Sequence, residues 1–329
     1  MTPPGPESCS ATRTELRRSL ISVHVAVALF GAAGLFARII DWPSPALVLA
    51  RVSIAALGLT TVLLVVERGR LWRVIRPAPG WLRLPLLGLL LAVHWVTFFH
   101  AIQVSSVAVG LLAFASFPIF TALLEPLAPG GSALDRTTLK ATVIVTLGIA
   151  LIVPGIDPAD PVTRGVFWGV VSGLTFALLS LGNRALVSRW GPLRLALHQN
   201  LWAAVALTLG ITVALMAAPI AAPFSAPGLA VGATSARMPL LPPHAPPPTE
   251  WAAVILLGLV FTAGAHALFI AGLRRVTASR AAVIATLEPV YGIMLAALWL
   301  GERPGLRVLT GGTLVLAAAL WVTRRSAKA

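Results

Sequence analysis

Four ionisable side chains lie inside long apolar stretches of this chain: Arg51, His94, His266 and Glu288. Such groups are rare at membrane depth because they must leave water, so each is a default candidate for function. A histidine can hydrogen-bond a solute or carry a proton near physiological pH. Glu288 could bind a cationic group or a proton, whereas Arg51 could meet an anionic group such as a carboxylate. These residue types indicate binding of a polar solute or a proton.

Each of the four residues also has a structural interpretation. His94 and His266 could form interhelical hydrogen bonds, and the sequence favours that interpretation for both. Glu288 could accept hydrogen bonds from a neighbouring helix. Arg51 could extend its charged end to the lipid headgroups, as long basic side chains near span ends do.

Three further polar residues could support a solute site. Tyr291 follows Glu288 by three residues and therefore lies on a similar helical face, where it could stack on a solute or hydrogen-bond the carboxylate. His100 and Gln103 are also three residues apart, nearer the predicted external end of their helix, and could line a vestibule.

Two asparagines, Asn183 and Asn200, lie near the predicted cytoplasmic side. An asparagine amide can hydrogen-bond a neighbouring helix at least as well as it can contact a solute. Trp95 is adjacent to His94 and must point to a different face, which indicates a packing role. The histidine spacings match no usual metal-ligand pattern, so no metal site is expected.

The helices that must position these residues contain a duplicated segment. Residues 94–121 and 266–292 each open with a histidine in an apolar helix, break at a polar hairpin, and enter a second apolar helix. That second helix contains Pro118 in the first copy and Pro289 in the second. The offset is 172 at the histidines and 171 at the prolines. Proline removes a helical hydrogen bond, so both positions are predicted helix bends.

Composition places the duplication in a membrane. Of the 329 residues, 57% are hydrophobic and only 11% are charged, whereas soluble domains carry about 25% charged residues. Residues 84–124 and 195–236 contain no Asp, Glu, Lys or Arg. Each run is long enough for two spans of about 20 residues. The apolar runs are continuous, which predicts an all-α integral membrane protein and argues against a β-barrel.

The apolar segments predict ten spans, and an even number returns the chain to the side where it began. We place the spans at residues 20–40, 46–66, 82–102, 106–127, 139–155, 165–187, 194–218, 250–272, 281–301 and 305–323. Nineteen of the 25 Lys and Arg residues then fall on the side of the termini. The positive-inside rule predicts cytoplasmic tails at 1–19 and 324–329. An external proline-rich loop is expected at 219–249.

The net charge of +14 follows from the same asymmetry. Basic residues at the cytoplasmic ends set orientation and contact anionic lipids, so no nucleic-acid partner is expected. Cys9 is the only cysteine, which excludes an internal disulfide. No phosphate-binding loop is present, and no nucleophile or catalytic cluster is visible. The sequence predicts no enzyme and no cofactor.

Several motifs resemble a known family. Residues 286–322 contain Leu287-Glu288-Pro289, Gly301-Glu302-Arg303 and Gly311-Gly312, and the first half contains Pro45 with Arg51, Ser105-Ser106 and Phe117-Pro118. In this order the segments resemble the EamA domain of the drug/metabolite transporter superfamily, from about residue 20 to residue 323. One asymmetry is visible, since Phe117 stands in the first copy where Glu288 stands in the second.

The resemblance implies ten helices around a central cavity formed by spans 1–4 and 6–9, with spans 5 and 10 at the periphery. Repeats at 20–156 and 165–323 contain five spans each, so the second copy is inverted relative to the first. The expected function is secondary transport of a small metabolite or drug across the inner (plasma) membrane, as an exporter or exchanger working by alternating access. Proton coupling and facilitated efflux both remain open.

The alternative from another class is a membrane-embedded enzyme that acts on a lipid or a polyprenyl carrier. A scaffold that organises lipids is a third interpretation. The expected partners are a small-molecule substrate and membrane lipids. The sequence leaves the oligomeric state open between a monomer and a homodimer.

Overall fold

The computed structural model describes residues 6–128, 136–221 and 239–326, apart from residues 71, 72, 75, 77, 154 and 156. Every regular element in these ranges is helical. Most of the proline-rich segment at 219–249 and the last residues of the C-terminal tail therefore lie outside the described residues.

The first half contains α1 (Pro6–Ala33), α2 (Phe36–Ile39), α3 (Ser44–Val66), η1 (Trp81–Arg83), α5 (Leu84–Val104), α6 (Val107–Phe114), α7 (Phe117–Leu124), η2 (Glu125–Leu127) and α8 (Arg136–Ile152). The second half contains α9 (Pro161–Trp190), α10 (Pro192–Ala221), α12 (Pro248–Gly258), η4 (Leu259–Gly264), α13 (Ala265–Gly272), α14 (Ala278–Ala285), α15 (Glu288–Trp299) and α16 (Leu306–Ser326).

The first helix starts earlier in the chain than the first predicted span. α1 begins at Pro6, well before the predicted first span at residue 20. The added residues include Ala, Glu, Leu and Arg, which are good helix formers even where they are polar. Hydropathy locates the part of a helix that fits a membrane, whereas propensity extends the helix beyond it.

Seven of the described helical segments are long and apolar enough to cross a membrane. They are Thr14–Ile39, Ser44–Val66, Trp81–Val104, Val107–Leu127, Pro161–Trp190, Pro192–Ala217 and Pro248–Gly272. Two shorter apolar helices, Lys140–Ile152 and Leu306–Trp321, accompany them. The chain is a multi-pass membrane protein with an all-helical structure.

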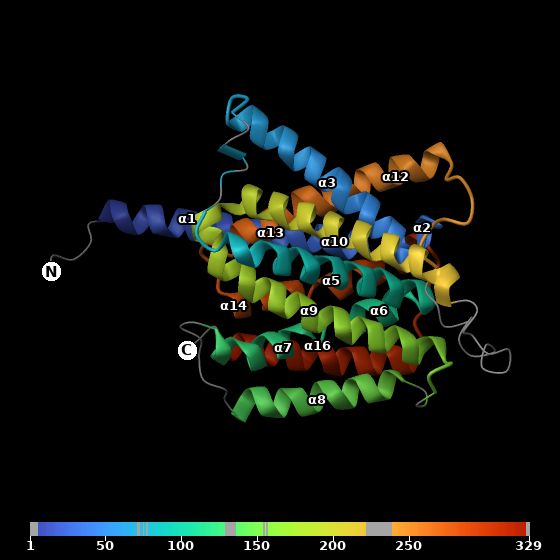
Figure 1. The fold of residues 1–329 in the computed structure, drawn as a ribbon. Helices are drawn as coiled ribbons and strands as arrows, with labels where there is room; N and C mark the ends of the chain where they lie inside the picture. The colour runs from blue at the N-terminus through green and yellow to red at the C-terminus, as the bar shows by residue number, and fades with distance from the viewer. Residues whose placement is uncertain are drawn as a thin grey trace.

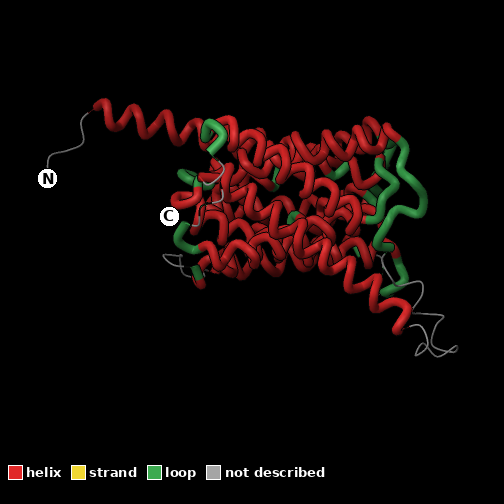
Figure 2. The backbone as a smooth tube through the Cα atoms, turned by 45° about the horizontal axis from the view of Figure 1, so that its top comes forward, coloured by secondary structure: helices red, strands yellow, loops and turns green. Residues whose placement is uncertain are grey.

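The helices run roughly along one common direction and define two ends (Figures 1 and 2). α1 begins and α16 finishes at the end where α9 also finishes, which we call the Arg189 end. α3 begins at the opposite end, where residues 239–247 also lie, and we call this the Trp42 end. α8 and α16 pack against each other on one flank of the molecule (Figure 1).

Helix contacts in one half have counterparts in the other. α5 packs on α9, and α1 packs on α13. α7 likewise packs on α9, while α15 packs on α1. α3 packs on α10, and α8 packs on α16. When each helix is exchanged with its counterpart in the other half, every one of these pairs becomes another pair in the set or stays the same.

Two glycines permit equivalent close contacts in the two halves. A Cβ atom on Gly31 of α1 would lie 2.9 Å from the backbone oxygen of Glu288, where α15 begins. A Cβ on Gly173 of α9 would lie 3.2 Å from the backbone nitrogen of Phe117, where α7 begins. Each glycine therefore lets a long helix approach the start of a short one. These contacts bring α1 and α9 against the starts of α15 and α7.

Candidate functional site

Both helices of the duplicated segment are interrupted just before their prolines. α6 ends at Phe114 and α7 begins at Phe117, with Pro118 in its first turn. α14 ends at Ala285 and α15 begins at Glu288, with Pro289 in its first turn. Proline suits a first helical turn because the donor that it lacks would have no helical acceptor there. The predicted bends are therefore helix breaks in the structure.

Glu288 occupies the break in the second copy. Its side chain is buried, at 3% exposure, and it is the only buried acid among the described residues. No hydrogen bond or ion pair joins it to Arg51, His94 or His266. Tyr291, one turn later, is half-buried and packs against the main hydrophobic core beside α1.

Arg51 is the largest fully buried side chain in the described part of the protein. It lies on α3, and its guanidinium carbon sits 3.8 Å from the ring centroid of Trp95 and 4.9 Å from that of Phe99. Its Nε donates a hydrogen bond of 2.8 Å to Thr262 Oγ1. Nη1 and Nη2 have no hydrogen-bond partner among the described residues. The structural interpretation in which Arg51 extends to lipid headgroups is wrong, because the side chain is 0% exposed.

Thr262 lies in η4, a π-helical segment between α12 and α13. Its hydroxyl donates to the carbonyl of Leu257, five residues earlier, at 2.7 Å while it accepts from Arg51. A π-helical turn is wider than an α-helical turn and often occurs at a functional site. This wide turn holds one side of the Arg51 guanidinium.

His94 connects α5 to α9 through Ser172. Its Nδ1 lies 2.9 Å from Ser172 Oγ, and both residues are buried. The imidazole is surrounded by aromatic rings, with centroid distances of 4.7 Å to Trp95 and 5.0 Å to Phe176. The contact is the interhelical hydrogen bond that one interpretation of His94 expected.

His266 belongs to a second buried chain of hydrogen bonds. Its Nε2 lies 2.8 Å from Gln199 Oε1, and Gln199 Nε2 donates to Asn183 Oδ1. Asn200 donates to the carbonyl of Ala196 at 2.8 Å, while its Oδ1 has no partner among the described residues. Helices α9, α10 and α13 are joined by these side chains. The described residues contain no group of three or more His, Cys, Asp or Glu that could hold a metal ion.

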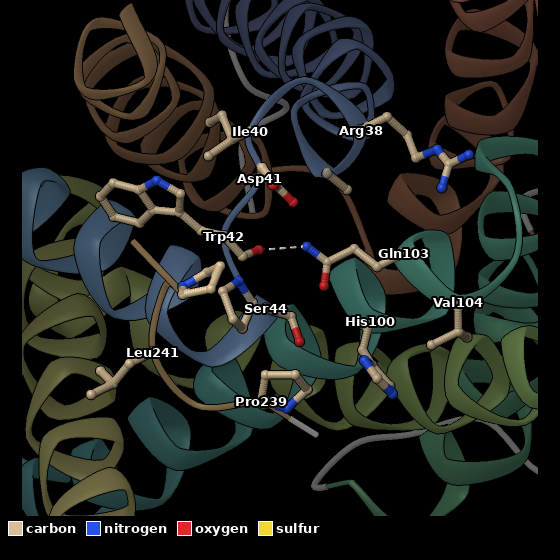
Figure 3. Close-up of a pocket in the computed structure, with 13 residues that line it drawn as sticks. Arg38, Ile40, Asp41, Trp42, Ser44, His100, Gln103, Val104, Pro239 and Leu241 are labelled. Atoms are coloured by element: carbon tan, nitrogen blue, oxygen red, sulfur yellow. Dashed lines mark hydrogen bonds between the residues drawn. The ribbon is translucent and has the colours of Figure 1, made fainter. Parts of the chain in front are cut away.

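A cavity of about 640 Å³, the Trp42 pocket, opens at the Trp42 end (Figure 3). Its lining includes Arg38 and Asp41, which carry opposite charges, together with His100 and Gln103 from α5. Gln103 Nε2 donates a 2.8 Å hydrogen bond to the carbonyl of Trp42, drawn in Figure 3. The structure thus brings His100 and Gln103 together on one pocket wall.

Contacts around this pocket tie the surrounding helices together. Trp42 Nε1 donates to Glu250 at 2.7 Å, which joins the start of α3 to α12. Glu302 accepts from the backbone nitrogen of Val107 at 3.1 Å and lies 3.8 Å from Arg38 Nε. These contacts cross between the two halves of the chain.

A second cavity of about 690 Å³, the Arg184 pocket, lies at the Arg189 end. It is rich in basic groups, and its charged lining residues are Arg83, Glu125, Arg184, Arg189 and Arg274. Arg184 donates to the carbonyl of Leu273, and Arg275 forms a 2.5 Å ion pair with Glu15. These contacts join α9 to α13 and the loop after α13 to α1.

The buried polar residues between the two pockets are closely surrounded by other side chains. Neither pocket is lined by Arg51, His94, His266 or Glu288. Phe98, Phe99, Phe114 and Phe117 are each no more than 1% exposed and fill the space around the buried polar groups. An aromatic core therefore surrounds these residues.

Sequence reasoning missed several partners of the predicted residues. Trp95 was assigned to packing, yet it covers one face of the Arg51 guanidinium. Ser172 and Thr262 were not singled out, although each hydrogen-bonds a predicted residue. A small hydroxyl residue in an apolar span is the available signal, but membrane helices contain many of them. The π-helical turn has no sequence signal that we recognise.

Known proteins resemble this chain in sequence and in fold. The profile described as the EamA-like transporter family matches residues 17–153 and 163–324. A protein of Archaeoglobus fulgidus named as an uncharacterized transporter is 25% identical over 224 residues, which cover 68% of this chain and 70% of that protein. A protein of known crystal structure matches 95% of this chain and 99% of its own, with a TM-score of 0.63 and 16% identity. That last similarity concerns the fold alone.

Proposed function

The chain belongs to the EamA-like transporter family, and we propose that it exports or exchanges a small organic solute as a secondary transporter. It works by alternating access, so a central site faces one side of the membrane at a time. The membrane is the inner or plasma membrane.

The observation that carries this proposal is the arrangement of two pockets on either side of a packed polar centre. The Trp42 pocket and the Arg184 pocket lie at opposite ends. Between them, Arg51 and His94 are buried among aromatic rings, and His266 is buried beside Gln199. A transporter needs a barrier between two aqueous entrances and polar groups within that barrier. This arrangement supports an occluded conformation in which both entrances are closed to the centre.

We propose ten spans in two inverted repeats as the architecture. The seven long apolar segments, the two shorter ones and the broken segment at 278–299 together supply ten crossings. The exchange of contact pairs between the halves supports a pseudo-two-fold axis. The breaks before α7 and α15 fit the discontinuous helices that form binding sites in inverted-repeat transporters.

The Arg189 end faces the cytoplasm in this proposal. Basic residues gather there, in the Arg184 pocket and beside it at Arg18 and Arg275. Such clusters favour the cytoplasmic side and contact anionic lipids. Both termini are then cytoplasmic, and the Trp42 pocket is the external vestibule.

Where a proton gradient drives transport, Glu288 carries the coupled proton. It is the one buried acid in the described residues and it sits at a helix break. A carboxyl group in that position can gain or lose a proton when a conformational change exposes it to water. Because Phe117 stands at the equivalent position of the first copy, only the second repeat supplies this carboxyl group.

Comparative metabolite profiling tests the proposed function. Medium from overexpressing cells and from cells lacking the protein is compared, and the compounds that differ are then used for counterflow in liposomes. We expect at least one compound to accumulate in the medium and to exchange only in liposomes that contain the protein. Catalytic turnover of a lipid, without counterflow of any compound from the metabolite pool, would favour the membrane-enzyme alternative instead.

A further inference from the structure

The buried guanidinium of Arg51 lacks an anionic partner. No ion pair joins Arg51 to an acid among the described residues. Taking a charge out of water is costly unless it is paired and hydrogen-bonded. The contact with the Trp95 ring offsets only part of this cost. The Arg51 guanidinium can therefore still bind an anion.

The geometry around Arg51 restricts how an anion can approach. Trp95 covers one face of the guanidinium, at 3.8 Å, and Thr262 occupies Nε. The two free groups, Nη1 and Nη2, form the end of the planar fork. Two parallel N–H donors match the two oxygens of a carboxylate.

The local charge limits the anion to a single negative charge. Arg51 is the only buried Lys or Arg in the described residues. The neighbouring histidines are already engaged by neutral partners, His94 by Ser172 and His266 by Gln199. A dianion would leave one charge unpaired in an apolar core, which is unfavourable.

We propose that Arg51 binds the carboxylate of a small organic monoanion, whose apolar body lies against the wall formed by Trp95 and Phe99. This substrate class rests on the proposed transport function, and it names what the central site recognises. Thr262 is a positioning residue, because its hydrogen bond holds the guanidinium through Nε while the two terminal nitrogens stay available.

A route from the Trp42 pocket to Arg51 follows two helices. Ser44 and His100 line the pocket. Arg51 follows Ser44 by seven residues on α3, which is about 10 Å along a helix that rises about 1.5 Å per residue. Phe99 is adjacent to His100 and contacts the guanidinium. In the proposed route, Phe99 moves aside so that the Trp42 pocket and Arg51 become connected.

The test measures ligand-induced stabilisation of the purified full-length protein in detergent. The probes are phenylacetate and hexanoate, their uncharged amides phenylacetamide and hexanamide, and inorganic phosphate. Each amide matches its acid in shape and differs in charge. We expect at least one of the two carboxylates, but neither amide, to raise the melting temperature of the unmodified protein. The shift should disappear in Arg51→Gln and persist in Arg307→Gln, which changes an exposed arginine.

Arg51→Lys serves as a second variant if Arg51→Gln does not yield folded protein. It keeps the charge but loses the fork, so we expect at least a tenfold weaker apparent affinity for the carboxylate. Equal stabilisation by acid and amide, an unchanged shift in either Arg51 variant, or no shift with either carboxylate contradicts the proposal. An equal, Arg51-dependent shift with phosphate contradicts the restriction to carboxylates.

This experiment separates the substrate class from the transport function. Binding that depends on Arg51 without counterflow of the bound acid would support the site and oppose transport. Counterflow restricted to cationic or neutral compounds, with no carboxylate binding, would support transport and oppose the site.

Discussion

Arg51 and Glu288 are the only buried Lys, Arg, Asp or Glu residues in the described part of the protein, and they do not pair with each other. A buried ion pair would satisfy both, so their separation requires another explanation. We infer that each meets a different partner during transport. The guanidinium meets the anionic substrate, and the carboxylate meets a proton.

This division of roles gives a prediction for Glu288→Gln. Glutamine keeps the size and hydrogen-bonding ability of the side chain but cannot carry the proton. We expect flux driven by a pH gradient to fall to background in liposomes, while the variant still inserts in the membrane and still exchanges substrate without a gradient. Flux is measured with the compound identified by metabolite profiling.

The matched control is Glu67→Gln, which changes an acid at the end of α3 that pairs with Arg73 at 3.5 Å. Pairs of this partly exposed kind contribute about 0–1 kcal/mol, so pH-driven flux should stay near the unmodified level. A Glu288→Gln protein with unchanged dependence on the pH gradient would remove Glu288 from the coupling step.

At the scale of elements, a mutation can test the close approach of helices at the breaks. Gly31→Ala would place a Cβ 2.9 Å from the Glu288 backbone oxygen and 2.9 Å from Tyr291 Cβ. Overpacking of this kind destabilises a protein by about 1–3 kcal/mol. We expect a lower melting temperature in detergent and a lower transport rate, because α1 and α15 must separate.

Gly210→Ala is the control for that prediction. Gly210 also lies within a helix, α10, but a Cβ there would meet no atom within 4 Å. Alanine is a better helix former by about 0.5–1 kcal/mol, so this variant should be unchanged or slightly more stable. A Gly31→Ala protein as stable as Gly210→Ala would show that α1 and α15 are not tightly packed.

The elements also show what the sequence could and could not predict. The apolar segments and the duplicated prolines are one-dimensional signals, so they located the helices and the interruptions before α7 and α15. The pairing of Arg51 with Trp95 depends on how α3 lies against α5, which no local pattern encodes. For the same reason, the sequence left the burial of Arg51 undecided, since its position near a span end fitted lipid contact equally well. The π-helical turn at η4 was missed too, because no local sequence pattern marks it.

At the scale of the whole molecule, the two ends differ in charge and in the pockets they carry. The Arg184 pocket is lined by four arginines and one glutamate, whereas the Trp42 pocket contains Arg38 and Asp41. A basic entrance on the cytoplasmic side would raise the local concentration of an anionic solute before it reaches Arg51. The proposed substrate charge and the proposed orientation are therefore mutually consistent and suit export.

That orientation gives the last prediction, because the single cysteine at position 9 makes site-specific labelling straightforward. In a Cys9→Ser background, Arg303→Cys places a thiol in the loop before α16, and Arg189→Cys places one at the other end. Both arginines are exposed, and each variant removes one positive charge. We expect a membrane-impermeant maleimide to label Arg303→Cys in intact cells and Arg189→Cys only after the membrane is opened. The reverse pattern would place the basic pocket outside, so the carboxylate would then enter the cell through it.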